Sequence, residues 1–162
     1  MNPLKTRIRK ACAEDAAAVW EIRNAAILSQ CKGHYPPESL AIWTGGAITE
    51  QFIQFVVEQF YVATVNDVVV GTGMIDRDTG RLDAIFVRPD IMRHGIGKQM
   101  VSFLEEIGRA AGLTELTLDS TLNAAAFYRS CGFVGEVIGI YLSPRGITLD
   151  CIPMTKVLRS PR

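Results

Sequence analysis

Residues 87–98 place two glycines, Gly95 and Gly97, between an apolar run and an amphipathic helical pattern. The preceding run, Leu82–Val87, has the composition of a strand and is stopped by Pro89. Glycines allow backbone N–H groups to approach a ligand closely. The first N–H groups of a helix have no intrahelical acceptor and carry partial positive charge. The segment therefore predicts a strand–loop–helix unit whose turn can bind an anion such as a pyrophosphate.

Two common phosphate-binding motifs do not fit this loop. A P-loop requires Ser or Thr directly after its Gly-Lys pair, and Gln99 follows Lys98 here. A dinucleotide fingerprint requires a third glycine where Met100 stands. By itself, a Gly-x-Gly pair is equally well explained as a tight turn between a strand and a helix.

A second motif follows about 25 residues later. Residues 123–133 read Asn-Ala-Ala-Ala-Phe-Tyr-Arg-Ser-Cys-Gly-Phe. Together with the glycine loop, this segment resembles the GCN5-related N-acetyltransferase (GNAT) superfamily, in its Gln/Arg-x-x-Gly-x-Gly/Ala and Asn-x-x-Ala-x-x-Phe-Tyr-x-x-x-Gly-Phe signatures. The two motifs and their spacing cover about half of the chain. One position departs from the pattern: the Gln/Arg position falls on Met92, which offers no comparable hydrogen bond, and the neighbouring Arg93 is the candidate to replace it.

The resemblance implies one α/β domain over residues 1–162. We expect a central mixed, mostly antiparallel twisted sheet of about six to seven strands with helices on its faces. The sheet is expected to splay open between the Leu82–Val87 and Leu116–Asp119 strands. Local patterns add three helices before residue 60, a hairpin turn at Asn66-Asp67, and two tail strands over residues 134–142 and 147–157.

The resemblance also implies acetyl-CoA as co-substrate and assigns residues to it. The pyrophosphate would lie on the loop and helix start formed by Arg93, His94, Gly95, Ile96, Gly97 and Lys98. The pantetheine arm would pair with backbone groups of Ile85, Phe86 and Val87, and Asn123 would contact the same arm. Tyr128 would donate a proton to the departing thiolate, a role that suits a phenol at neutral pH.

The acceptor amine must lose a proton before it attacks, and three sources of a base stay open. Asp83 is the leading candidate, because it precedes the strand residues that would contact the cofactor. Asp119 is the second candidate, and a water relay without a dedicated base is the third. A solvated or salt-bridged strand carboxylate explains Asp83 without any catalytic role.

Composition excludes several other classes. The 162 residues are 48% hydrophobic, and 17 basic residues balance 17 acidic ones, so we expect no nucleic-acid partner. No apolar run approaches the length of a membrane span. The four cysteines and two histidines have no metal-ligand spacing, so no metal site is expected. These features predict a reduced, cytoplasmic protein.

The predicted function is transfer of an acetyl or short acyl group from acyl-coenzyme A to a primary amine, by direct attack. The alternative is a non-catalytic acyl-CoA-binding or sensing module with the same fold. The acceptor is a small molecule or a peptide amine, and His34, Tyr35 and Trp43 are candidates to line its pocket. A homodimer is compatible with the sequence, which does not specify the oligomeric state.

Overall fold

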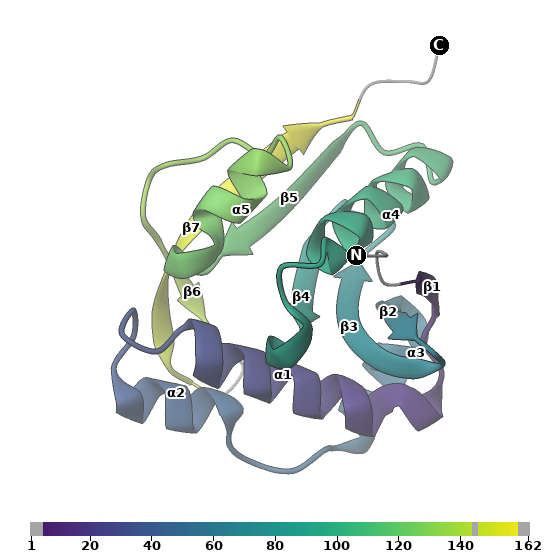
Figure 1. Ribbon diagram of the computed structural model, residues 1–162. Helices are drawn as coiled ribbons and strands as arrows, with labels where there is room; N and C mark the ends of the chain where they lie inside the picture. The colour runs from purple at the N-terminus through teal and green to yellow at the C-terminus, as the bar shows by residue number, and fades with distance from the viewer. Residues whose placement is uncertain (1–4, 144–145, 159–162) are drawn as a thin grey trace.

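The computed structural model describes residues 5–143 and 146–158, whose strands form two antiparallel sheets (Figure 1). The first sheet has the order β1-β2-β3-β4, with bounds Thr6–Lys10, Phe60–Val65, Val68–Ile75 and Leu82–Val87. The second has the order β5-β7-β6, with bounds Glu115–Ser120, Thr148–Val157 and Gly139–Leu142. The predicted α/β fold class is confirmed.

Five α-helices accompany the sheets within the described residues: α1 (Ala16–Gln30), α2 (Pro37–Thr44), α3 (Glu50–Gln59), α4 (Ile96–Ala110) and α5 (Ala125–Ser130). Pro37 occupies the first position of α2, where its fixed φ and missing N–H cost nothing. Thr49 caps α3, because its hydroxyl oxygen accepts a 3.1 Å hydrogen bond from the N–H of Phe52.

The first sheet is covered on both faces. Phe60 and Val62 of β2 pack in a cluster with residues of α1 and α3. The alternate residues, Tyr61 and Ala63, pack with α4 in a second cluster that includes Met100. Successive strand residues point to opposite faces of a sheet, so α1 and α3 lie on one face of the first sheet and α4 lies on the other.

Two glycines of β3 let α4 approach the sheet. A Cβ atom at Gly73 would lie 2.6 Å from the Met100 side chain, and one at Gly71 would lie 3.2 Å from that of Ile96. Both contacts are shorter than carbon atoms normally allow. The start of α4, which carries the glycine loop, is therefore held directly against the centre of the sheet.

The two sheets meet at an isolated parallel bridge between Arg81 and Thr117, where the N–H of Thr117 donates a 3.0 Å hydrogen bond to the carbonyl of Gly80. Among the described residues no other bridge joins β4 to β5, so the two strands diverge from this point. The expected splay between Leu82–Val87 and Leu116–Asp119 is present.

One predicted element is shorter than its sequence pattern. The apolar run 134–142 was expected as one strand, but only Gly139–Leu142 pairs continuously with β7. Val137 and Ile138 are instead 81% and 61% exposed. The hairpin turn is as predicted: Asn66 and Asp67 have φ values of 51° and 65°, the left-handed conformation that these residue types tolerate.

Candidate active site

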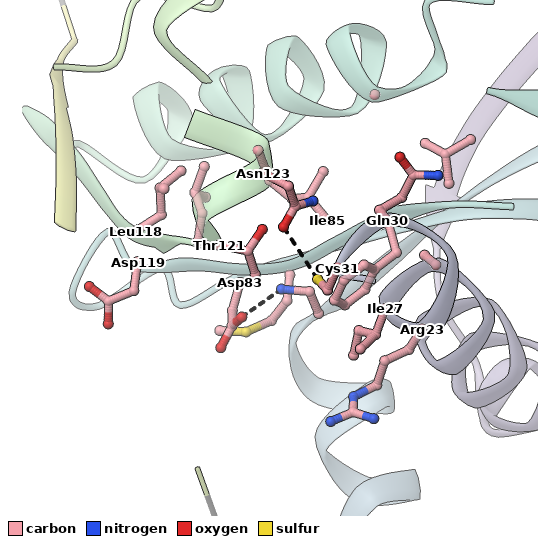
Figure 2. Close-up of a pocket in the computed structure, with 18 of the residues that line it drawn as sticks. Arg23, Ile27, Gln30, Cys31, Asp83, Ile85, Leu118, Asp119, Thr121 and Asn123 are labelled. Atoms are coloured by element: carbon pink, nitrogen blue, oxygen red, sulfur yellow. Dashed lines mark hydrogen bonds between the residues drawn. The ribbon is translucent and has the colours of Figure 1, made fainter. Parts of the chain in front are cut away.

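A cavity of about 840 Å³ lies where β4 and β5 diverge, and it extends under α1 and α2. Figure 2 shows Asp83, Asp119 and Arg23 among the side chains that line it. The structure brings the predicted site residues together at this cavity, with the exception of His94, which is exposed and not part of the lining. Met92 also lines the cavity.

The glycine loop turns the chain into α4 through two left-handed residues. Arg93 has φ +70° and Gly95 has φ +81°, and Gly95 is the residue that precedes the helix. The first hydrogen bond of the helix runs from the N–H of Gln99 to the carbonyl of Gly95, over 3.0 Å. The N–H groups of residues 96–98 precede this bond, so they are the donors that a helix offers to an anion.

The absence of a side chain at Gly97 serves helix packing as well as the close approach of a ligand. A Cβ atom at this position would lie 3.1 Å from the ring of Phe127 in α5. The small residue thus lets the second motif pack against the start of α4. The glycine loop and the Phe127-Tyr128 segment are in this way held against each other, although about 30 residues separate them in the sequence.

Strand β4 contains a bulge at the cavity. Asp83 lies opposite Met74 and Phe86 lies opposite Thr72, so β4 has one more residue than β3 between these pairs. Ala84 within the bulge has φ +52°. Beyond the bulge, the N–H of Arg88 donates to the carbonyl of Val70 over 2.8 Å. Because backbone groups alternate along an antiparallel strand, those of Val87 point away from β3 and toward β5.

Tyr128 of α5 is a buried polar side chain that lines the same cavity as Val87. It is 9% exposed and lies between the rings of Phe127 and Phe133, whose centroids are 5.1 and 6.0 Å from its own. Within the described residues its hydroxyl makes no hydrogen bond, yet it lines the cavity. Burial raises the pKa of Tyr128 above its ordinary value, with a smaller effect from the charge of Asp83. The phenol is therefore protonated and available as a donor.

The two candidate carboxylates have different surroundings. Asp119 forms an ion pair with Arg81 at 2.7 Å. Asp83 accepts a 2.7 Å hydrogen bond from the N–H of Ala84, and no cation of the described residues is within ion-pair distance of it. The Asp83 side chain is accessible to solvent, but protein atoms surround it at the base of the cavity. This desolvation raises the pKa of Asp83 above its ordinary value.

Asn123 and Tyr35 connect the second motif to α1 and the loop after it. The Cys31 thiol at the end of α1 lies 3.4 Å from the side-chain oxygen of Asn123, as Figure 2 shows. The Tyr35 hydroxyl donates to the carbonyl of Asp150 over 2.6 Å and accepts from the N–H of Leu122 over 3.1 Å. Tyr35 therefore supports the cavity wall through its backbone partners.

Of the other residues expected to line the acceptor pocket, one lies at the cavity and one does not. Trp43 lines the cavity beside Tyr35, with ring centroids 6.0 Å apart in an edge-to-face arrangement. His34 is exposed and lies outside the cavity lining. Sequence reasoning did not select four further lining residues, Trp20, Arg23, Arg81 and Tyr141. They belong to no motif, and only the packing of α1 and β6 against the first sheet brings them together.

Two further observations concern other kinds of site. The described residues hold no cluster of three or more His, Cys, Asp or Glu side chains that would suit a metal ion. In the same part of the chain, each helix is too short or too polar to cross a lipid bilayer.

The chain was compared with known proteins. A family model described as "Acetyltransferase (GNAT) domain" matches residues 57–135. The IAA acetyltransferase of Azospirillum brasilense is 37% identical over 82 residues, which are 46% of this chain and 54% of that protein. A curated Bacillus subtilis protein matches over 45% of its own length. The chain thus aligns with about half the length of these curated relatives.

Solved structures match over nearly the whole chain. A GCN5-related N-acetyltransferase from Rhodopseudomonas palustris has a TM-score of 0.88 at 27% identity, with 98% of this chain and 99% of that chain covered. The protein YncA from Salmonella typhimurium, solved with its cofactor acetyl-CoA, has a TM-score of 0.69 at 23% identity, with 96% of this chain and 95% of that chain covered. The fold, the two motifs and the family model all match the GNAT superfamily.

Proposed function

We propose that the protein is an acyl-CoA-dependent N-acyltransferase that moves an acetyl or other short acyl group to a primary amine. The observation that carries this proposal is the position of Tyr128. A buried, protonated phenol without a hydrogen-bond partner among the described residues lines the same cavity as the glycine loop and the outward-facing backbone of Val87. A protein that only binds acyl-CoA has no need of a proton donor at this point.

The residues present fit coenzyme A. The amides at the start of α4, with the side chains of Arg93 and Lys98 in the cavity lining, would hold its pyrophosphate. The backbone of Val87 would pair with the pantetheine arm as a neighbouring strand does. The acetyl-CoA bound to YncA, which shares this fold, supports acetyl-CoA as the donor.

The reaction follows from these positions. The neutral amine attacks the thioester carbonyl, and the N–H of Val87 stabilises the negative charge that develops on the carbonyl oxygen. The C–N bond forms, the C–S bond breaks, and the phenol of Tyr128 gives its proton to the leaving thiolate. The products are an amide and free coenzyme A. Solvent returns a proton to Tyr128.

Asp83 is the proposed acceptor of the proton that the incoming ammonium group loses. Its raised pKa brings the carboxylate closer to the basicity that a general base needs near neutral pH. Asp119 is less suited to this role, because its charge is already used in the ion pair with Arg81. A water relay remains the other route.

The proposal is tested first by ligand selectivity and then by turnover. Acetyl-CoA at a hundred times its dissociation constant should stabilise the fold by about 2.7 kcal/mol, which a melting curve detects, whereas ATP and NAD should give no shift. Free thiol should then appear when amines are added. A shift with ATP but not acetyl-CoA contradicts the cofactor assignment, and acetyl-CoA binding without turnover of any amine identifies a sensing module instead.

A further inference from the structure

The cavity continues beyond Asp83 into a compartment walled by aromatic rings. Its lining includes Trp20 of α1, Phe52 and Phe55 of α3, and Phe60 of β2. We call these four residues the aromatic subsite. They lie on the α1 and α3 face of the first sheet, and the coenzyme A contacts proposed above do not use them.

Strand register places the aromatic subsite beside the proposed base. Phe60 lies opposite Met74, and Met74 lies opposite Asp83, so the three residues form one row across β2, β3 and β4. Residues directly opposite one another point to the same face of a sheet. Two strand spacings separate Phe60 from Asp83, or about 10 Å. A molecule on this face can therefore reach the carboxylate and the rings at the same time.

The rings of the aromatic subsite are arranged edge to face. Trp20 and Phe52 have centroids 5.2 Å apart, Phe52 and Phe60 are 6.3 Å apart, and Phe55 and Phe60 are 5.6 Å apart. Aromatic groups prefer this geometry to a parallel stack. Phe55 is 41% exposed and Phe60 is 3% exposed, so the group opens to solvent at Phe55 and is closed at Phe60. One more flat ring would extend the same arrangement.

Charge in the cavity favours a cation at one place. Asp119 is paired with Arg81, whereas Asp83 has no ion pair within the described residues. The guanidinium of Arg23 lies 5.1 Å from the centroid of the Trp20 ring and donates to the carbonyl of Trp43, so it borders the aromatic subsite without neutralising Asp83 by direct contact. Asp150 also lines the cavity without an ion pair in the described residues, but only Asp83 shares the row with Met74 and Phe60. Asp83 is therefore the carboxylate for an amine whose ring lies in the aromatic subsite.

From this juxtaposition we propose that the acceptor is an aralkylamine, a primary amine joined by a short chain to a flat aromatic ring. The ammonium group binds at Asp83 and the ring enters the aromatic subsite across Met74. The substrate class rests on the proposed function, because the amine must attack a thioester held beside Val87. The chemistry is unchanged: the amine loses one proton, gains the acyl group, and releases the thiol.

The first experiment compares amines at saturating acetyl-CoA. We expect kcat/KM for 2-phenylethylamine to exceed that for n-propylamine by at least about tenfold, because the ring adds buried apolar surface. It should also exceed that for n-octylamine, which has the same number of carbons but no ring. If n-octylamine or a lysine-containing peptide is the better acceptor, the aralkylamine assignment is wrong.

The second experiment blocks the compartment. Ala47 is exposed and lines the cavity, so Ala47→Trp should fill it without disturbing the core. Phe52→Leu removes one ring and keeps an apolar side chain. Each variant should abolish most of the preference for 2-phenylethylamine over n-propylamine, and Ala47→Trp should leave the n-propylamine rate and the acetyl-CoA affinity unchanged. Val57→Ala, an exposed change in α3 outside the cavity lining, is the matched control and should keep the preference.

Failure of the proposed function and failure of the proposed acceptor class give different results. Loss of the proposed function would appear as no acetyl-CoA binding or no thiol release with any amine. Failure of the acceptor class alone would appear as normal acetyl-CoA binding and turnover, with no advantage for aralkylamines or with an advantage that Ala47→Trp leaves intact.

Discussion

The hydroxyl of Thr72 on β3 donates a 2.6 Å hydrogen bond to the carbonyl oxygen of Ala84, the left-handed residue in the bulge of β4. Thr72 is 1% exposed and Ala84 is half-buried, so water has limited access to this hydrogen bond. The bulge determines where Asp83 and Val87 lie relative to β5. The side chain of Thr72 on the neighbouring strand thus fixes the positions of Asp83 and Val87.

Thr72→Val removes the donor and keeps the side-chain shape. The carbonyl of Ala84 then loses its partner, and we expect the free energy of unfolding to fall by about 1–3 kcal/mol. Turnover should fall further than acetyl-CoA affinity, since Asp83 and Val87 shift. Urea denaturation and thiol-release kinetics measure both effects. Thr64→Val is the control: the Thr64 bond to the carbonyl of Arg7 is a weak 3.5 Å, so little change is expected.

Tyr128→Phe tests the proton donor. The ring keeps its contacts with Phe127 and Phe133, so the fold should be retained. We expect kcat to fall by about 10²–10⁴-fold, the usual contribution of a positioned acid, with an unchanged dissociation constant for acetyl-CoA. Stopped-flow thiol release and calorimetry provide the two values. Equal kcat in the variant would remove Tyr128 from the mechanism.

Gly95→Ala tests the anion site, with Gly112→Ala as a matched control. Both glycines have φ near +80°, both flank α4, and a Cβ atom at either would meet no other atom within 4 Å. Each change should therefore cost about 1 kcal/mol of stability from backbone conformation alone. Only Gly95→Ala should weaken acetyl-CoA binding, as titration calorimetry can measure. Equal affinities in the two variants would show that the loop is only a turn and does not bind the anion.

Asp83→Asn tests the base and has a defined pH signature. The folded-state pKa of Asp83 is raised above its ordinary value of 3.8, so folding favours the protonated form. Stability contributed by this group is therefore lost as the pH rises from 3.8 through the raised value. The asparagine variant should gain stability relative to the wild type as the pH increases to neutrality, as urea denaturation at several pH values would show.

The same variant should lose activity if Asp83 is the base. We expect the acidic limb of the kcat/KM pH profile to disappear, while Asp119→Asn keeps that limb. The reverse result would assign the base to Asp119, and two unchanged profiles would point to the water relay.

Local signals in the sequence specified much of this molecule. Strand, turn and helix patterns predicted the bounds of β4, the turn at Asn66-Asp67 and the start of α4, because each depends on neighbours along the chain. The apolar run 134–142 was misread for the same reason. Its residues have strand composition, but Val137 and Ile138 are largely exposed, and hydrophobicity alone does not say which residues are covered.

The candidate site was predictable in part. The two glycines and Tyr128 belong to motifs, so they could be selected from their order and spacing. The row from Phe60 through Met74 to Asp83 could not, because it depends on the register of three strands, and bulges shift that register at both pairings. The motifs contain no information about Arg23 or Trp20 either, since the place of these residues in the cavity follows from how α1 crosses the sheet.

The bridge between Arg81 and Thr117 is the sole backbone pairing of β4 with β5 in the described residues. An extended pantetheine arm paired with the backbone of Val87 would add main-chain contacts along the opening between the two sheets. Binding of acyl-CoA would then stiffen strands in both sheets, although most of these strands do not touch the ligand. Slower amide exchange in β7 as well as β4 would record that mechanical coupling.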